Sequence, residues 1–377
     1  MRPFLEISGQ EVTAGDRRAV MDVLKSPRLA LGPVASAFEQ ACAKVAGVRH
    51  AVAVSSGTAG LHALVRAFGI GHGDEVLTTP FSFVASANCV LFEHASVRFV
   101  DIDPVTWNLD PAQLEAAVTR KTRALLPVHV FGLPYDHAAV SRLARRRGIP
   151  VIEDSCEAIG ASWQGRPAGS LGDAAVFAFY PNKQITTGEG GMIVTRHAAV
   201  AGFCRSVINQ GRGSHGFLEH VRLGYNYRMD EIHAALGLSQ VSRLESILNR
   251  RATVAGHYDR LLRDLPGVTL PAVVPGLVRS WFVYVIRLDR AFDRDAVCRA
   301  LEREGIQTRP YFPPIHLQPF YRERFGYRRG AFPVAEAVGA STLALPFHTR
   351  LRPAEAGRVA KALHKILSGR AALRRRS

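Results

Sequence analysis

The alternation of short apolar runs with amphipathic stretches, which begins at His50, is the feature that most constrains the fold. The apolar runs have the length and residue types of strands, and the stretches between them carry apolar residues at helical spacing. The expected strands span residues 50–56, 74–80, 97–103, 123–130 and 149–155, and the expected helices span 58–68, 83–94 and 136–148. Apolar strands connected by helices form a sheet that helices cover on both faces. The sequence therefore predicts an α/β fold with a mixed, mostly parallel sheet flanked by helices.

The chain changes character after about residue 250. Before that point, strand patterns continue at 173–180 and 191–195, and one long helical pattern covers 229–251. After it, an aromatic strand pattern and two helical stretches indicate a smaller α+β unit. Because 377 residues exceed what one small core accommodates, we expect two domains. These are a large domain over residues 1–250, with the N-terminal arm included, and a small C-terminal domain over residues 251–377.

The net charge of +16 does not by itself indicate a nucleic-acid partner. Only six of the 48 basic residues are lysines, and the arginines are spread along the whole chain. Two basic runs, at 145–147 and in the tail at 370–377, carry no interleaved aromatic residues. No segment approaches the roughly 18 apolar residues of a membrane span. We therefore expect neither nucleic-acid nor membrane binding.

The five cysteines are odd in number, widely spaced and without a CxxC pair. This pattern is not that of a disulfide framework or of a structural metal site, and it fits a reducing compartment. The N-terminus lacks the apolar segment of a signal peptide. We expect a cytoplasmic protein without a metal site.

Candidate binding residues follow the expected strands, where ligands bind in parallel sheets. Ser55, Ser56, Gly57 and Thr58 open a helix after the first strand. Backbone N–H groups at such a start bind anions when a glycine permits close approach, although an ordinary Ser or Thr N-cap has the same pattern. Phe83 follows the next strand, and both a ring platform and a core aromatic are open interpretations.

Charged residues follow two later strands. Glu153 and Asp154 stand at the end of the strand at 149–155. Neighbouring residues of a strand point to opposite faces, so only one of them easily faces a given site, and solvent exposure is the competing interpretation. Lys183 stands in a polar, glycine-rich turn after the strand at 173–180. In a chain with so few lysines, this position is a candidate for chemistry rather than for surface charge.

A lysine, a carboxylate, an aromatic platform and a helix-start phosphate cradle are together what pyridoxal 5′-phosphate requires. The lysine forms a Schiff base, the carboxylate pairs with the pyridine nitrogen, the aromatic stacks on the ring, and the helix start holds the phosphate. No single motif compels this interpretation. Four motifs in a consistent order favour it over the alternatives.

The sequence resembles the DegT/DnrJ/EryC1/StrS family of sugar aminotransferases over nearly its whole length. FYPNK followed by GEGG, at 179–191, is highly specific, whereas SSGTAGLH at 55–62 is moderately so. Other matching stretches are 29–40, 73–88, 99–111, 150–161, 222–237 and 308–321. The resemblance implies the fold-type I architecture of aspartate aminotransferase, with a large domain and a smaller C-terminal α+β domain.

The resemblance also implies a role for each matching residue. Lys183 would form the Schiff base and move the proton between substrate Cα and cofactor C4′. Asp154 would pair with the pyridine nitrogen, which leaves Glu153 a lesser role, and Phe83 would stack on the ring. Gly57 and Thr58 would bind the phosphate through backbone N–H groups.

Three further residues concern the neighbouring subunit and the substrate. In the dimers of this family a second subunit completes each site, so Asn226 and Arg228, in GYNYRM, would reach the other subunit's cofactor. His316, in PIHLQP, matches a substrate-binding position near the mouth of the site, and a histidine that caps a proline-rich turn is the alternative.

Two positions depart from the family pattern. Ala178 stands where many relatives have a serine that hydrogen-bonds the phosphate, and Ser55 or Ser56 could substitute for it. Glu157, a cofactor-binding candidate, stands where many relatives have Gln or His, which leaves the sugar class open. Lys183 itself argues against the dehydratase branch, which has a histidine at that position.

The resemblance implies a homodimeric, pyridoxal-phosphate-dependent aminotransferase of amino-sugar biosynthesis. L-glutamate would donate the amino group, and a nucleotide-linked keto sugar, most of all a 4-keto-6-deoxy sugar, would accept it. A 3-keto sugar or a keto-cyclitol is the alternative acceptor. A non-catalytic regulator that retains the fold is a further alternative, with only the basic tail in its favour.

Overall fold

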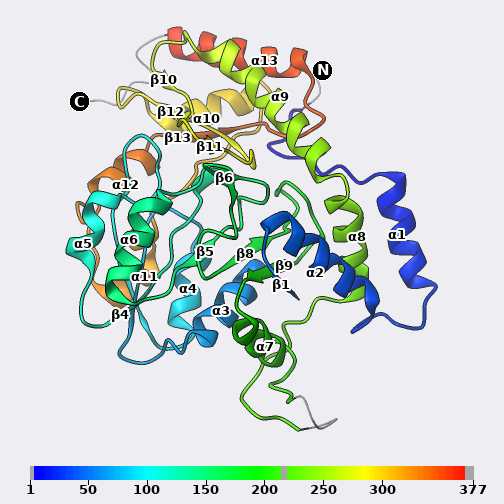
Figure 1. Ribbon diagram of the computed structural model, residues 1–377. Coiled ribbons are helices and arrows are strands. Elements are labelled where there is room, and N and C mark those ends of the chain that lie inside the picture. Colours follow the sequence, from blue (N-terminus) through cyan, green and yellow to red (C-terminus); the bar gives the residue numbers. More distant parts are fainter. Residues whose placement is uncertain (1–3, 214–218, 370–377) are drawn as a thin grey trace.

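Within the residues that the computed structural model describes, 4–213 and 219–369, seven strands form one mixed sheet (Figure 1). They are β1 (His50–Val54), β2 (Glu75–Thr78), β3 (Ser96–Phe99), β4 (Thr122–Leu125), β5 (Ile152–Asp154), β8 (Ala174–Ala178) and β9 (Gly191–Thr195). Parallel bridges from Leu125 to Val151 and from Val128 to Asp154 give the order β3-β2-β4-β5-β8-β9-β1. Among these strands β9 runs opposite to the others. The sheet is mixed and mostly parallel, as predicted.

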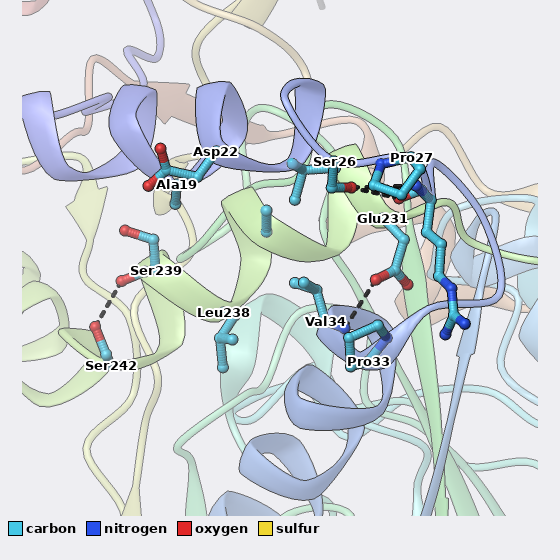
Figure 2. A pocket seen from close by; sticks show the side chains of 13 residues that line it. Ala19, Asp22, Ser26, Pro27, Pro33, Val34, Glu231, Leu238, Ser239 and Ser242 are labelled. Carbon is cyan, nitrogen blue, oxygen red and sulfur yellow. Dashed lines mark hydrogen bonds between the residues drawn. The ribbon is translucent and has the colours of Figure 1, made fainter.

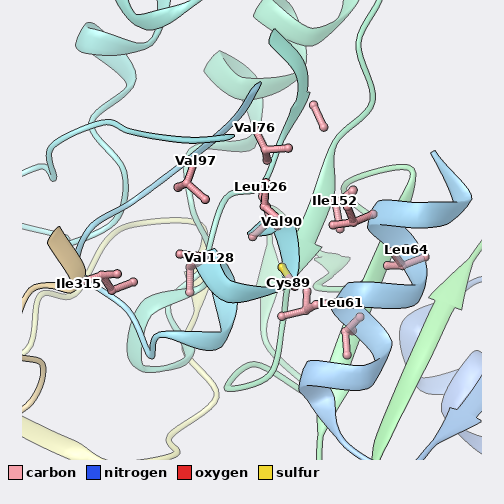
Figure 3. Packing of buried hydrophobic residues seen from close by; sticks show 14 of the residues in the cluster. Leu61, Leu64, Val76, Cys89, Val90, Val97, Leu126, Val128, Ile152 and Ile315 are labelled. Atoms are coloured by element: carbon pink, nitrogen blue, oxygen red, sulfur yellow. The ribbon is translucent and has the colours of Figure 1, made fainter. Parts of the chain in front are cut away.

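Helices cover both faces of the sheet. They are α2 (Pro33–Ala46), α3 (Gly57–Ala67), α4 (Ala85–Leu91), α5 (Leu114–Ala117), α6 (His137–Arg147) and α7 (Ala198–Val207), with short turns η1 (Pro111–Gln113) and η2 (Val130–Gly132). Leu61 and Leu64 of α3 share one core with Val76 and Ile152 (Figure 3). On the other face, Phe38 of α2 is buried with the alternate residues of β1 and β8. Both faces are buried, which explains why these strands are apolar throughout.

The helical pattern at 229–251 is two helices, α8 (Glu231–Val241) and α9 (Leu244–Leu262), so the prediction of one long helix was wrong. The break falls at Ser242 and Arg243. The Ser242 hydroxyl donates to the carbonyl of Ser239 at 2.8 Å, and such a contact competes with the regular helix. The Arg243 guanidinium forms an ion pair, at 2.8 Å, with the Asp16 carboxylate of α1 (Ala14–Leu24). These side-chain contacts are absent from the apolar periodicity that predicted the helix.

The C-terminal part is built on a second, antiparallel sheet, which lies above the large sheet in Figure 1. Its strands are β10 (Val268–Thr269), β12 (Tyr284–Leu288) and β13 (Thr342–Leu345). Helices α9, α10 (Arg294–Arg303) and α13 (Pro353–Ser368) contribute to its core. A small third sheet joins β6 (Ser162–Trp163), β7 (Arg166–Pro167) and β11 (Leu277–Val278). The predicted small α+β unit is present in this region.

One C-terminal segment returns to the large sheet. It contains η3 (Ile315–Leu317), α11 (Pro319–Phe325) and α12 (Pro333–Gly339). Ile315, Tyr321 and Val338 are buried in the same core as Val76 of β2. Contacts of this kind cross the expected boundary between residues 250 and 251, which stays a prediction.

In the described ranges, no helix combines the length and the apolar character that crossing a membrane requires. The basic tail at 370–377 lies outside the described residues. The cytoplasmic location stays a prediction.

Candidate active site

Three parallel strands end at one edge of the large sheet, and the candidate residues follow these ends. Val54, the last residue of β1, lies opposite Gly191, which in turn lies opposite Ala178 at the end of β8. Asp154 ends β5 and pairs with Val176 of β8. The helix start after β1, the carboxylate of β5 and the lysine turn after β8 are therefore neighbours.

The start of α3 forms a cradle of unpaired N–H groups. The Ser56 hydroxyl caps the helix by accepting from the Ala59 N–H at 3.1 Å. In the described part of the chain, the N–H groups of Gly57 and Thr58 have no acceptor. A Cβ atom at Gly57 would lie only 2.9 Å from the Cβ of Ala178, so glycine is required here. Ser56 is thus an ordinary cap that still leaves two donors at the positive end of the helix dipole, where an anion binds.

The two adjacent acids have separate environments. Asp154 is buried, and its carboxylate accepts from the Ser86 hydroxyl at 2.6 Å and from the Cys156 N–H at 3.1 Å. Glu153 has no exposed surface and is 2.9 Å from His129 Nε2. It also accepts from the N–H groups of Gly169 and Gly172. Glu153 is therefore fully occupied in holding the backbone, and Asp154 is the acid on the side of Ser86.

Lys183 lies in the turn after β8 with most of its side chain buried. Its Nζ is 3.5 Å from Glu157 Oε1 and 4.1 Å from the centroid of the Phe282 ring. The other oxygen of Glu157 accepts from the Phe131 N–H at 2.9 Å. Burial raises the pKa of the Glu157 carboxyl, while the charge of Lys183 acts against this rise. The amine is held between a carboxyl and an aromatic face rather than in solvent.

Phe83 is 62 % exposed, which is unusual for so large an apolar ring and excludes the core interpretation. It lines a groove of about 800 Å³ together with Phe312, Phe320 and Arg324. Ser86 Oγ lies 3.1 Å from the carbonyl of Phe83 and 2.6 Å from Asp154, so the ring is attached next to the acid. An exposed ring beside a buried carboxylate is suited to cover a flat ligand.

Asn226 and Arg228 flank Tyr227, whose backbone lies beside the helix start. The carbonyl of Tyr227 between them accepts from the Ser55 N–H at 2.8 Å. Asn226 is exposed, and Arg228 donates to Asn209 at 2.9 Å. Their predicted contact with a second subunit stays a prediction.

His316 is fully buried, 2.9 Å from Glu336 and packed against Phe332. Its side chain has no surface for a substrate in this conformation. The placement favours the alternative of a histidine that stabilises the local chain, and its role in substrate binding stays a prediction.

Sequence reasoning missed two residues of this site. Ser86, which donates to Asp154, stands one helical turn after Phe83 in an unremarkable SFVAS segment. Phe282 comes from the segment before β12, 99 residues after Lys183, and no local pattern relates the two. Only the hydroxyl spacing in SFVAS could have pointed to Ser86, and nothing pointed to Phe282.

The arrangement fits pyridoxal phosphate. The cradle at Gly57 and Thr58 suits the phosphate, and a Cβ at Gly191 would obstruct it, because that atom would lie 2.8 Å from the Gly57 nitrogen. Asp154 suits the pyridine nitrogen, Phe83 the ring face and Lys183 the aldehyde. A cavity of about 720 Å³ between α1, α2 and α8, lined by Val23, Val34 and Leu238, contains none of these residues (Figure 2). It is not the candidate active site.

A model of the DegT/DnrJ/EryC1/StrS aminotransferase family matches residues 10–364. The chain belongs to this family. It is 38 % identical over 369 residues to GDP-perosamine synthase of Caulobacter vibrioides, covering 97 % of this chain and 99 % of that protein. It is 34 % identical to the solved DesV of S. venezuelae, with a TM-score of 0.92 over 98 % of this chain and 100 % of that one. Spr1654 of Streptococcus pneumoniae, a putative sugar aminotransferase solved in its PLP-form, is 25 % identical, with a TM-score of 0.93 over 97 % of this chain and 99 % of that one.

Membership in the DegT/DnrJ/EryC1/StrS family makes the protein a sugar aminotransferase of a pyridoxal-phosphate-dependent class. The fold class is confirmed as well, because the TM-scores extend over nearly the whole chain. The alternative of a non-catalytic regulator has no support in the site, whose lysine, carboxylate and cradle are all present.

Proposed function

We propose that the protein transfers the amino group of L-glutamate to a nucleotide-linked keto sugar, with a 4-keto-6-deoxy sugar as the acceptor. The products are 2-oxoglutarate and the nucleotide-linked amino sugar. The observation that carries the proposal is the position of the Lys183 amine, 3.5 Å from Glu157, at the sheet edge that also holds Asp154 and the free N–H groups of α3. The GDP-linked sugar in the name of the Caulobacter relative supports a nucleotide-linked acceptor.

Each site residue has a stated task in this proposal. Pyridoxal phosphate, when bound, supplies an electron sink for the bond that breaks at the substrate Cα. The N–H groups of Gly57 and Thr58 bind its phosphate, and Phe83 covers one ring face. The Asp154 carboxylate keeps a proton on the pyridine nitrogen. Lys183 would bind the cofactor covalently at rest and, once released, would take the substrate Cα proton at Nζ and deliver it to C4′ of the cofactor.

In this proposal Glu157 acts on the lysine and on the incoming sugar. Its carboxyl contacts Nζ with one oxygen and is fixed by the Phe131 N–H at the other. Burial raises the pKa of this carboxyl, and the charge of Lys183 and the Phe131 N–H act against the rise. A Gln or His at this position would carry different donors, so Glu157 contributes to the choice of acceptor.

The proposal includes a homodimer in which each subunit completes the other's site. The segment with Asn226 carries exposed apolar residues, since Val221 is 49 % and Leu223 is 72 % exposed. Apolar residues gathered at a surface indicate a protein contact. A second copy that covers them would bring Asn226 and Arg228 to the neighbouring cofactor.

The acceptor can be tested in two half-reactions. L-glutamate first transfers its amino group to the bound cofactor of the purified holoenzyme, and the donor is then removed. The protein is next mixed with 4-keto-6-deoxy, 3-keto and cyclitol acceptors in turn. We expect the absorbance of the bound cofactor to return to its starting form with a nucleotide-linked 4-keto-6-deoxy sugar, with the amino sugar seen by mass spectrometry. If only a 3-keto sugar or a keto-cyclitol restores the starting absorbance, the proposed acceptor is wrong. If L-glutamate does not convert the bound cofactor, the proposed donor is wrong.

Two variants distinguish a specific role of Lys183 from the general effect of removing a lysine. Lys183→Ala should abolish both half-reactions and the covalent attachment of cofactor. Lys121→Ala is the matched control, because Lys121 is exposed and lies at the other end of the sheet strands, ahead of β4. It should leave both half-reactions unchanged. Full turnover by Lys183→Ala would overturn the assignment.

A further inference from the structure

Arg251 of α9 is a buried guanidinium that binds no acid in the described part of the chain. It is 4 % exposed, and its two terminal nitrogens donate to backbone carbonyls instead. It donates to the carbonyl of Lys183 at 2.9 Å, to that of Phe282 at 3.1 Å and to that of Trp281 at 3.4 Å. Burial lowers the pKa of Arg251 to about 10, which still leaves the group charged at neutral pH.

These contacts join three segments that are distant in the sequence. Lys183 belongs to the turn after β8, Phe282 to the strand entry before β12, and Arg251 to the helix α9. Two of the three carbonyls that Arg251 binds belong to the lysine and to the aromatic residue whose ring centre is 4.1 Å from the lysine amine. One guanidinium therefore fixes the backbone of the lysine and the backbone of the ring against which its amine rests.

Stability alone gives a weak reason for this arrangement. A buried charge without a counter-charge is costly, and hydrogen bonds to carbonyls recover only part of the lost hydration. An apolar side chain of similar length, packed against Phe347 as Arg251 is, would avoid this cost. The planar fork of arginine instead offers several donors in a fixed geometry, which suits it to hold several carbonyls at once.

We propose that Arg251 is a positioning residue that sets where the Lys183 amine stands, by holding the carbonyls of Lys183 and Phe282 together. The proposal rests on the proposed role of Lys183 as the residue that binds the cofactor and moves the proton. It assigns α9, which spans the junction of the two sheets, a direct link to the catalytic lysine. A small displacement at Lys183 is enough to matter, because a shift of about 1 Å in a reacting group can cost about 10²-fold in rate.

The test compares Arg251→Met with Val254→Ala, a control in the same helix. Val254 is buried in the core of the small sheet, and this cluster of described residues includes none from the lysine turn. Both variants should lower the melting temperature. Arg251→Met alone should lower kcat by about 10- to 10²-fold with the KM for the keto sugar nearly unchanged. It should also slow the covalent attachment of pyridoxal phosphate to Lys183, measured by borohydride trapping and mass spectrometry.

A second variant keeps the test informative if Arg251→Met does not fold. Arg251→Lys retains the charge but offers fewer, differently directed donors, so it should recover part of both kcat and the attachment rate. The proposal is overturned if Arg251→Met and Arg251→Lys attach the cofactor and turn over as Val254→Ala does. Failure of the proposed function has a different signature, because Lys183→Ala would then retain covalent attachment in an otherwise wild-type chain.

Discussion

Ala178 ends β8 with its methyl group directed at the start of α3. The close approach of its Cβ to the place where a Cβ of Gly57 would stand shows that position 178 borders the phosphate cradle. A serine there would therefore reach the proposed phosphate. In this chain the nearby hydroxyl of Ser56 already caps α3, and the cradle consists of backbone donors.

Ala178→Ser should strengthen cofactor binding. One hydrogen bond to a charged group contributes about 1.5–3 kcal/mol, so the dissociation constant of pyridoxal phosphate should fall by about 10- to 10²-fold. Titration of the cofactor into the apoprotein, followed by fluorescence, measures this constant. Gly57→Ala is the opposing control, because its methyl group would collide with Ala178 and should weaken binding. An unchanged constant in Ala178→Ser would mean that the phosphate lies away from β8.

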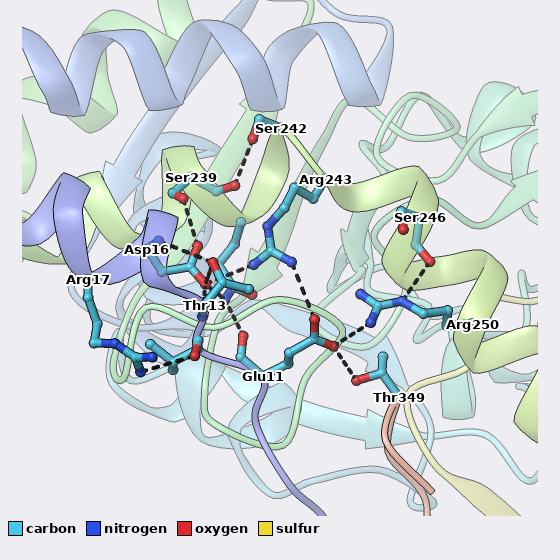
Figure 4. A network of polar contacts seen from close by, with 12 residues as sticks. Glu11, Thr13, Asp16, Arg17, Ser239, Ser242, Arg243, Ser246, Arg250 and Thr349 are labelled. Carbon is cyan, nitrogen blue, oxygen red and sulfur yellow. Dashed lines mark hydrogen bonds and ion pairs between the residues drawn. The ribbon is translucent and has the colours of Figure 1, made fainter. Parts of the chain in front are cut away.

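At the scale of elements, the N-terminal helix α1 is attached to the α8–α9 junction by one buried acid (Figure 4). Asp16 forms a capping box with Thr13 and accepts from Ser239, Gln240 and Arg243. Burial acts to raise the pKa of Asp16, but hydrogen bonds from Ser239, Thr13 and Arg243 outweigh it, and the pKa lies below its ordinary value of 3.8. The same contact with Arg243 interrupts the predicted long helix.

Arg243→Met should destabilise this junction in a pH-dependent way. A carboxyl whose pKa is lower in the folded than in the unfolded protein stabilises the fold above its unfolded pKa and loses this contribution as the pH falls. We expect the variant to lose about 2 kcal/mol of unfolding free energy at neutral pH, with the loss shrinking below about pH 4. Urea unfolding across this pH range measures it.

Arg250→Met is the control for this junction. Arg250 is more exposed than Arg243 and binds Glu11 at 2.8 Å, so its loss should cost less than about 1 kcal/mol. Equal losses in the two variants, or a loss in Arg243→Met that does not depend on pH, would contradict the account.

At the scale of the whole molecule, the proposed dimer makes each active site a product of two chains. Lys183, Asp154 and the α3 cradle come from one subunit, and Asn226 and Arg228 are expected from the other. Consider a twofold dimer in which one chain has a defect in the first set and the other chain has a defect in the second set. One site then contains both defects, and the other site is intact.

Mixed dimers should therefore recover activity. Lys183→Ala and the double variant Asn226→Ala/Arg228→Ala should each be nearly inactive alone, and refolding them together should give roughly a quarter of wild-type activity. Lys183→Ala mixed with Asp154→Ala is the control and should recover nothing, because each mixed site then carries one defect. Recovery in neither mixture, or a monomer in sedimentation, would contradict the shared site.

The core of the site could be predicted because its signals are local. Gly57 and Thr58 stand at a helix start, Asp154 at a strand end and Lys183 in a glycine-rich turn, and each pattern is complete within a few residues. The choice between Glu153 and Asp154 required the tertiary structure, because it depends on which face of β5 contacts His129 and which face contacts Ser86. His316 shows the opposite case, where a matching motif gave no information on burial.

The sequence alone determined the mostly parallel sheet, the helices over it and the lysine, acid and cradle after its strands, because periodicity and turn chemistry act over neighbouring residues. The tertiary structure alone decided the break between α8 and α9, the burial of His316 and the contacts of Phe282 and Arg251 with Lys183. Apart from the local hydrogen bond of Ser242 to Ser239 at the helix break, these features depend on residues 20 to 227 positions apart that meet only when the sheets and helices pack. A linear pattern carries no information on such meetings, because packing, rather than spacing along the chain, sets the distances.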